Sequence, residues 1–409
     1  MIIKEKGIHK RTIVFILIGI VLVFLIGLLL FQGYHWYRIR TAKIEVTLKK
    51  DRTLEFASKK RVSDYIEKIN GTIVHDDWIP STKLGKQDVT FEFVNDDHIK
   101  VSYTYQVEIV DTVEPMIWLG KSYTVYKDSE INLTKAILCG DNYDNRPTCI
   151  IKGDYDIHTV GEYPLEYEAI DSSGNRESQS FTLRVIEKPE GKKKETSSSN
   201  DTYFEDVKKK YKKKDTKIGI DISSWQGEVD FKKIKEAGVE FVMVRIGGTL
   251  GTNQSYFLDK QFQRNMKEAE KYGIDTGVYF YSYANSTKSA VKDAKWVIQQ
   301  LKPYKIKLSV AFDWEEWDHF NDYHLSFFGL TNMAETFLDT IQKAGYDGML
   351  YSSKTYLDNI WYPTKYDVWL AHYTDKTNYQ GNYKIWQLCA NGKIDGIENY
   401  VDIDIMYTE

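Results

Sequence analysis

Residues 308–315 read LSVAFDWE, an apolar run that ends with two acidic residues, Asp313 and Glu315. Such a run is typical of a buried β-strand. Seven more runs of this kind occupy residues 217–223, 241–248, 276–283, 348–353, 367–373, 384–389 and 401–407. Amphipathic helical patterns lie between them at 230–237, 258–272, 286–301 and 330–344, whereas the later connections are too short for regular helices. Alternating strands and helices predict a parallel sheet, and eight such strands predict a closed α/β barrel.

The predicted strands carry acidic residues at or near their ends. Asp221 lies in the first strand, and Asp402 and Asp404 lie in the last. Because the first and last strands of a closed barrel are neighbours, we expect Asp221 to approach Asp402. Asp313 and Glu315 share one face of the fourth strand, at a spacing of about 6.6 Å.

Carboxyl groups gathered in this way raise one another's pKa, so that one stays protonated as a general acid while another is ionised. Glycoside hydrolysis uses this division of labour. Two other interpretations of these acidic residues are possible. They could be aspartates that cap turns or helices at the strand ends, or they could form a metal site. The tryptophans that enclose the acidic run at 312–318 favour a sugar over a metal. Inward-facing aromatic rings stack on sugars, so the predicted glycan contacts are Tyr281, Tyr283, Trp369 and Tyr373, together with Gln387.

Residues 218–409 resemble the glycoside hydrolase family 25 muramidases. The matching motifs are GIDIS (219–223), WQG (225–227), GVYFYSY (277–283), FDWE (312–315), WLAHY (369–373), WQ (386–387) and VDID (401–404). One departure is the sequence RIGG at 245–248, where some members have a Lys, a Ser or Thr and a Glu-Gly pair. The resemblance implies a modified (β/α)5β3 barrel that cleaves the β-1,4 bond between N-acetylmuramic acid and N-acetylglucosamine in peptidoglycan, with no metal or cofactor.

The resemblance also implies roles for the acidic residues. Glu315 is expected to be the general acid, and Asp313, Asp221 and Asp402 complete the acidic cluster. A hypothesis for Asp313 is that it orients the substrate's 2-acetamido group as an internal nucleophile. Trp314 and Trp386 are equally consistent with glycan binding and with the core. The competing functions are a non-catalytic scaffold that binds the cell wall and a barrel hydrolase that acts on chitin-like glycans.

The N-terminus predicts a membrane anchor. Residues 12–31 contain no charged side chain and match the roughly 20 residues that a helix needs to cross a bilayer. Residues 1–11 are basic and are expected in the cytoplasm, which places the rest of a single-pass protein outside the cell. A cleaved signal peptide is the alternative, although its apolar region is usually shorter.

Residues 41–187 predict two all-β modules, at 41–110 and 111–187. Apolar positions such as Val89 and Phe91 recur 76 residues later as Leu165 and Tyr167, which indicates an internal repeat. The second module resembles bacterial immunoglobulin-like repeats, so both are expected to be immunoglobulin-like sandwiches that act as spacers, with cell-envelope proteins as candidate partners. Aspartates in the second module are interpreted as turn residues rather than a calcium site: Asp141, Asp144, Asp154 and Asp156.

The remaining features concern the cysteines, one linker and the overall charge. Cys139 and Cys149 are close enough to form a disulfide outside the cell, and two free thiols are the alternative. Cys389 is expected in the core. Residues 188–217 are rich in lysine and serine and predict a tether. The length of 409 residues predicts several domains, and the net charge of −4 argues against nucleic acid as a partner.

Overall fold

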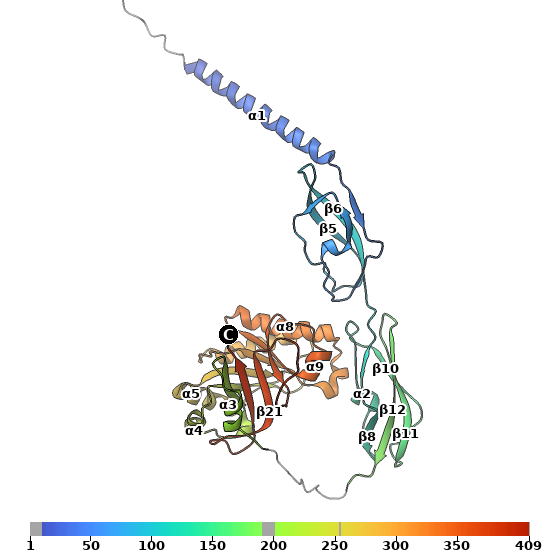
Figure 1. Cartoon of the computed structure of the whole chain (residues 1–409), viewed down its shortest axis with the longest axis vertical. Helices are drawn as coiled ribbons and strands as arrows, with labels where there is room; N and C mark the ends of the chain where they lie inside the picture. Colours follow the sequence, from blue (N-terminus) through green and yellow to red (C-terminus); the bar gives the residue numbers. More distant parts are fainter. Residues whose placement is uncertain (1–9, 190–200, 253–254, 409) are drawn as a thin grey trace, which may run out of the picture. The chain divides into compact units, whose positions relative to one another are not determined.

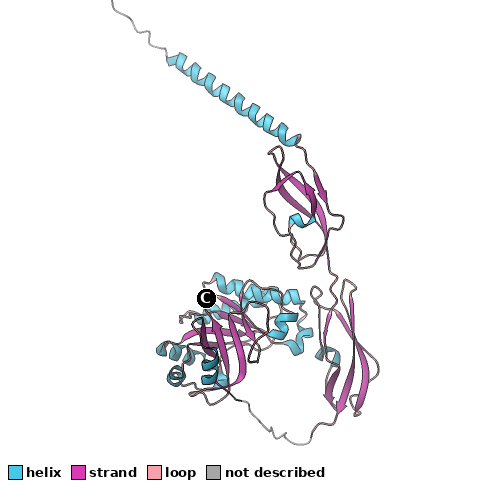
Figure 2. Cartoon of the chain, in the orientation of Figure 1, coloured by secondary structure: helices cyan, strands magenta, loops and turns pink. Residues whose placement is uncertain are grey.

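The computed structural model describes residues 10–189, 201–252 and 255–408, and the chain divides into two compact units, 1–112 and 113–409 (Figures 1 and 2). The first unit begins with the long helix α1 (Lys10–Arg40). Within its segment Phe15–Arg40, a window of 18 residues has a mean hydropathy of 3.0 and is not covered by other parts of the protein. Its length and composition are those of a helix that can cross a membrane. The basic stretch predicted at 1–11 lies almost entirely outside the described residues.

The rest of the first unit is a β module. Its strands pair as one sheet in the order β2-β6-β5-β4 and as a second sheet of β1 and β3. The elements are β1 (Val46–Leu48), β2 (Thr53–Glu55), the 3-10 helix η1 (Val62–Tyr65), β3 (Ile66–Ile69), β4 (Gly71–Ile73), β5 (Gly85–Asn95) and β6 (Lys100–Val110). Apolar side chains on alternate positions of β5 and β6 form its core, as the period of two predicts.

The second unit begins with another β module, at 113–187. Its sheets have the orders β10-β11-β12-β8 and β7-β9. The elements are β7 (Met116–Trp118), β8 (Ser122–Tyr126), α2 (Leu133–Ala136), β9 (Leu138–Gly140), β10 (Thr148–Lys152), β11 (Gly161–Ile170) and β12 (Arg176–Ile186). The strands β11 and β12 begin 76 residues after β5 and β6, which is the offset of the sequence repeat. Cys139 and Cys149 form a disulfide.

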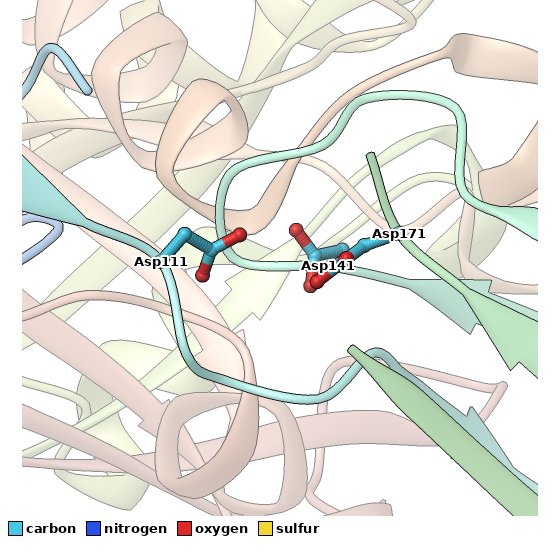
Figure 3. Close-up of side chains that lie close together, drawn as sticks. All are labelled: Asp111, Asp141 and Asp171. Atoms are coloured by element: carbon cyan, nitrogen blue, oxygen red, sulfur yellow. The ribbon is translucent and has the colours of Figure 1, made fainter. Parts of the chain in front are cut away.

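The aspartates of the second module stabilise turns. One oxygen of Asp141 accepts hydrogen bonds from the backbone N–H groups of Tyr143 and Asp144. Figure 3 shows Asp141 with Asp171 of the same module, and with Asp111 from the segment that precedes it. A carboxylate oxygen of Asp141 lies within 4.8 Å of one of Asp171, which itself accepts a hydrogen bond from the backbone N–H of Asn175.

The remainder of the second unit contains the predicted barrel. Its sheet has the order β13-β21-β20-β19-β18-β17-β15-β14-β22, with β16 paired to β15, and a further pairing of β21 with β22 closes it. The strands are β13 (Thr202–Tyr203), β14 (Thr216–Ile222), β15 (Phe241–Thr249), β16 (Tyr256–Leu258), β17 (Asp275–Tyr281), β18 (Val310–Asp313), β19 (Gly348–Ser353), β20 (Asp367–Ala371), β21 (Ile385–Lys393) and β22 (Val401–Tyr407). Among the described residues, the closed ring contains two kinds of pairing. Its strands β14, β15, β17, β18, β19, β20 and β21 pair in parallel in this order, whereas β22 is antiparallel to both β21 and β14.

Helices surround this barrel. Four of them, α4, α5, α6 and α8, coincide with the helical patterns of the sequence. The helical segments are α3 (Phe204–Tyr211), η2 (Ser224–Gln226), α4 (Phe231–Ala237), α5 (Phe262–Tyr272), α6 (Thr287–Leu301), η3 (Trp317–His319), α7 (Phe320–Tyr323), α8 (Phe327–Lys343) and α9 (Lys354–Asn359).

The predicted tether at 188–217 differs from the structure in its second half. Residues 190–200 lie outside the described residues, but β13 pairs with β21, α3 follows it, and β14 already begins at Thr216. Phe204 and Val207 are buried in the barrel's core. They lie three residues apart and so share one face of a helix whose other side carries lysines. The helix is therefore amphipathic, which its lysine-rich composition alone does not indicate.

Candidate active site

The inside of the barrel has an apolar layer and a polar layer. The apolar layer consists of Phe241, Met243, Ala311, Met349, Trp369, Ile385 and Met406. Successive inward-facing positions on a strand are two residues apart. The next inward positions towards the carboxyl ends of the parallel strands are Arg245, Asp313, Tyr351 and Gln387, and the corresponding step on β22 leads to Asp404. The period of two therefore places a set of polar side chains at one end of the barrel.

Three acidic residues meet where β14 pairs with β22. Asp221 lies directly opposite Asp402 in the antiparallel register, and Asp404 lies opposite Gly219. Asp221 is 6% exposed and Asp404 is fully buried, whereas Asp402 is half-buried. The expected approach of Asp221 to Asp402 is therefore observed.

Gln387 and Trp369 support these carboxylates. The amide nitrogen of Gln387 donates to Oδ2 of Asp221 over 2.8 Å, and its carbonyl oxygen accepts from the hydroxyls of Tyr351 and Tyr373. The indole N–H of Trp369 donates to Asp404 over 2.8 Å. Neutral donors thus hold Asp221 and Asp404 in place.

Burial raises the pKa of every carboxyl in this cluster. The pKa of Asp221 lies well above its usual range because of burial and the nearby charges of Asp402 and Asp404. Burial likewise raises the pKa of Asp402 to about 6. For Asp313, burial and then Glu315 raise the pKa, while Arg245 opposes them. Arg245 itself is held in place by an ion pair with the buried Asp259 over 2.7 Å.

Glu315 lies at the open edge of the cluster. The strand β18 ends at Asp313, so Glu315 follows the strand instead of closing it. Trp314, between the two acids, is fully buried and its indole N–H donates to the carbonyl of Ala284 over 3.0 Å. The Glu315 side chain is exposed to solvent, yet the protein around its carboxyl displaces enough water to raise its pKa; a hydrogen bond with Tyr351 opposes that shift.

The structure separates the predicted glycan contacts into two groups. Tyr281 and Tyr283 are partly exposed with ring centroids 5.4 Å apart, and Tyr373 is 58% exposed. Trp369 and Gln387, by contrast, are buried inside the barrel, so their expected role as direct glycan contacts does not fit their positions. The reason is that both side chains point inwards below the rim, where they bind the acidic residues. Trp314 and Trp386 are buried as well and belong to the core.

Four residues of this region were not among the predicted site residues. Asp404 follows Asp402 by two positions and so shares its face, which is a signal that the sequence contains. Tyr351 and Arg245 occupy the inward positions that the alternation of their strands predicts. Trp225 lies in η2, shortly after the end of β14, and is 76% exposed, which is unusual for tryptophan.

Two hollows lie near or opposite this region. One of about 500 Å³ is lined by Tyr373, Leu388 and Asn391 and lies beside the acidic end. The other, of about 1130 Å³, is at the opposite end of the strands, and its lining includes Lys217 and Tyr407 but none of the acidic cluster. The larger hollow therefore does not belong to the acidic site.

Comparisons with known proteins find chains that are similar to this one. The autolytic lysozyme of Clostridium acetobutylicum is 30% identical over 190 residues, which are 46% of this chain and 54% of that protein. The chain thus spans about half the length of this relative.

Two solved structures are also similar. The modular autolysin LytC of Streptococcus pneumoniae is 26% identical, with 59% of this chain and 56% of that chain covered and a TM-score of 0.43. A family 25 glycosyl hydrolase of Bacillus anthracis is 21% identical, with 47% and 89% covered and a TM-score of 0.41.

The sequence model of the glycosyl hydrolases family 25 matches residues 220–397, which extend from the first strand of the barrel almost to the last. The matched segment includes Asp221, Asp313 and Glu315, while Asp402 and Asp404 follow it by a few residues. Residues 220–397 are therefore a glycosyl hydrolase family 25 domain.

Proposed function

We propose that the protein is a muramidase that hydrolyses the β-1,4 bond between N-acetylmuramic acid and N-acetylglucosamine in bacterial peptidoglycan. The observation that carries the proposal is the group of carboxyls with raised pKa at one end of the barrel, of which Glu315 reaches solvent. A carboxyl that keeps its proton and can contact a substrate is what the first step of glycoside hydrolysis requires. The similarity to an autolytic lysozyme supports peptidoglycan as the substrate.

In this proposal Glu315 is the general acid that protonates the leaving glycosidic oxygen. Once it has lost its proton, it acts as the base that activates water. Asp313 lies two residues away and orients the 2-acetamido group, whose oxygen attacks the anomeric carbon as an internal nucleophile. Asp221 and Asp402 complete the acidic cluster. Asp402, with a pKa of about 6, is ionised at neutral pH, and its negative charge stabilises the positive charge of the oxocarbenium-like transition state. Neither a metal nor a cofactor takes part.

The exposed rings near the acidic end are proposed to bind the glycan strand. Tyr281, Tyr283 and Tyr373 keep this role from the sequence-based expectation, and the exposed Trp225 joins them. Aromatic rings present flat apolar faces that pack against sugar rings. Gln387 and Trp369 act indirectly, because they hold Asp221 and Asp404 in place.

We further propose that α1 anchors the protein in the cell membrane, with residues 1–11 in the cytoplasm and the barrel outside. The disulfide in the second module supports an extracellular location. The two β modules are proposed to be immunoglobulin-like spacers, and the strand directions support a barrel of the (β/α)5β3 type. Protease added to intact cells should then degrade the chain beyond residue 40; complete protection would refute this orientation.

The decisive test of activity is Glu315→Gln in the full chain, with Glu236→Gln as the matched control. Glu236 lies on α4, one of the helices that surround the barrel, and its side chain is 66% exposed. Purified peptidoglycan is digested and the new reducing ends are identified. We expect muramic acid reducing ends from the wild type and the control and none from Glu315→Gln.

Other outcomes would identify other functions. Cleavage of chitin oligosaccharides in preference to peptidoglycan would make the protein a hydrolase of chitin-like glycans. Binding of peptidoglycan without any new reducing end would make it a wall-binding scaffold. Wild-type activity in Glu315→Gln would refute the role of Glu315.

A further inference from the structure

The second β module contacts the part of the barrel that directly follows Glu315. We define the acid loop as residues 316–326, which include η3 and α7 and connect Glu315 to α8. The side chain of Asn321 in this loop lies against β9. Its carbonyl oxygen accepts from the backbone N–H of Cys139 over 3.0 Å, and its amide nitrogen donates to the carbonyl of Ile137 over 2.9 Å.

The module also supplies hydrogen-bond acceptors to the start of α8, at the end of the acid loop. The first N–H groups of a helix have no partner within the helix. In α8, the N–H of Phe327 donates to the carbonyl of Asp141 over 2.8 Å, and that of Phe328 donates to the carbonyl of Asn142 over 3.2 Å. The backbone of the second module therefore adds to the N-cap Ser326, whose own hydroxyl accepts from the N–H of Gly329.

A series of aromatic contacts leads from the module to the residue beside Glu315. Trp118 of β7 lies 5.4 Å from Tyr356 of α9, measured between ring centroids. Tyr356 stacks on Trp317 of the acid loop at 3.8 Å, and Trp317 meets the edge of Trp314 at 4.9 Å. Trp314 is the neighbour of Glu315 in the sequence and is fully buried.

The packing at this contact is as close as that of a protein core. Leu138 is 8% exposed and belongs to the same apolar cluster as the barrel's outer core. A Cβ atom placed on Gly140 would lie 2.5 Å from a ring carbon of Phe327 and 3.0 Å from one of Phe320. No side chain fits there without displacing these rings, and the disulfide from Cys139 fixes the strand from the other side.

We propose that the second β module is a positioning part of the hydrolase, because its contacts through Asn321 and Trp118 hold the acid loop and thereby the carboxyl of Glu315. The module is then more than the spacer that its sequence suggests. This inference rests on the proposed function, since it concerns the efficiency of the same acid.

The test uses the full chain with Asn321→Ala and with Asn332→Ala as the matched control. Asn321→Ala removes the side-chain hydrogen bonds of Asn321 to Thr134, Ile137 and Cys139 of the second module. Asn332 is exposed on α8. Displacing a catalytic group by a fraction of an ångström to 1 Å reduces turnover roughly 10- to 100-fold. We expect kcat on a soluble peptidoglycan fragment to fall by that factor in Asn321→Ala with KM unchanged, and the control to match the wild type. Trp118→Leu, at the other end of the contact, should lower kcat in the same way.

Hydrogen–deuterium exchange of residues 316–326 provides a readout that does not depend on activity. The proposal predicts faster exchange of this segment in Asn321→Ala and Trp118→Leu, with the rest of the barrel unchanged. Wild-type kcat in both variants, or a loss of kcat without faster exchange in the acid loop, would overturn it. If the wild type itself cleaves no glycan, the proposed function is refuted. If exchange of the acid loop is unchanged in both variants, the positioning role of the module is refuted, whatever the activity.

Discussion

Asp293 is a buried acid outside the proposed catalytic set, and replacing it with asparagine should make the fold less sensitive to alkaline pH. It lies on α6 and is fully buried. The hydroxyl of Ser282 donates to its Oδ2 over 2.7 Å, and the hydroxyl of Tyr256 donates to its Oδ1 over 3.0 Å. Burial raises the pKa of Asp293 from 3.8 to about 6, although these two hydrogen bonds oppose the shift.

The size of the effect follows from this pKa. A shift of one pKa unit corresponds to about 1.4 kcal/mol, so a rise of about two units corresponds to about 3 kcal/mol. Because the folded state holds the proton more tightly than the unfolded state, the contribution is fully present below about pH 4. It is lost as the pH rises through about 6. Asparagine has no proton to lose and avoids this loss.

The assay compares the unfolding of the barrel in the wild type, Asp293→Asn and the control Asp347→Asn, whose side chain is exposed. Any hydrogen-bond energy that asparagine loses is the same at every pH, and the other buried carboxyls affect all three proteins equally. We therefore expect the free energy of unfolding of Asp293→Asn, relative to wild type, to improve by about 3 kcal/mol between pH 4 and pH 8. An equal difference at the two pH values would refute the reasoning.

Two further predictions address the acid and the edge of the domain. Tyr351→Phe removes the hydrogen bond that lowers the pKa of Glu315. The alkaline limb of the pH profile of kcat/KM should therefore move to higher pH. A limb at the same or a lower pH would contradict the effect of Tyr351 on Glu315. Phe204→Ala leaves a cavity in the barrel's core and should cost about 3–5 kcal/mol of stability, measured by urea unfolding. Tyr203→Ala, at a side chain that is 55% exposed, is its control, and equal effects of the two would place 202–211 outside the core.

The strands of the barrel could be predicted because each is a short apolar run bounded by polar residues. All eight predicted runs overlap strands of the closed ring, and the helical patterns between them coincide with helices. The direction of β22 is another matter. Its run VDIDIMY has the same apolar alternation as its neighbours, and only the short connection from β21 distinguishes it. Periodicity determines which side chains share a face and carries no information on strand direction.

Other features escaped prediction because they depend on contacts between distant parts of the sequence. The bond between Asn321 and Cys139 joins residues 182 positions apart, and nothing near either residue indicates it. The segment 202–211 was missed for a different reason. Lysines dominate its composition, which is typical of a solvated segment. Its two apolar residues, Phe204 and Val207, favour a folded helix only because they are buried against the barrel.

The positions of the aromatic residues show why composition alone overestimates a sugar-binding surface. Trp369 satisfies the pattern of an inward ring near a strand end, as Tyr281 does. On β20, however, the inward position at Trp369 is level with the apolar layer, whereas Tyr281 lies at the end of β17. Burial thus separates the ring of Trp369, which supports a buried carboxylate, from the partly exposed ring of Tyr281. Under the proposed function, glycan specificity then comes from the strand ends and the loops that follow them, where Trp225 and Tyr373 have their rings in solvent.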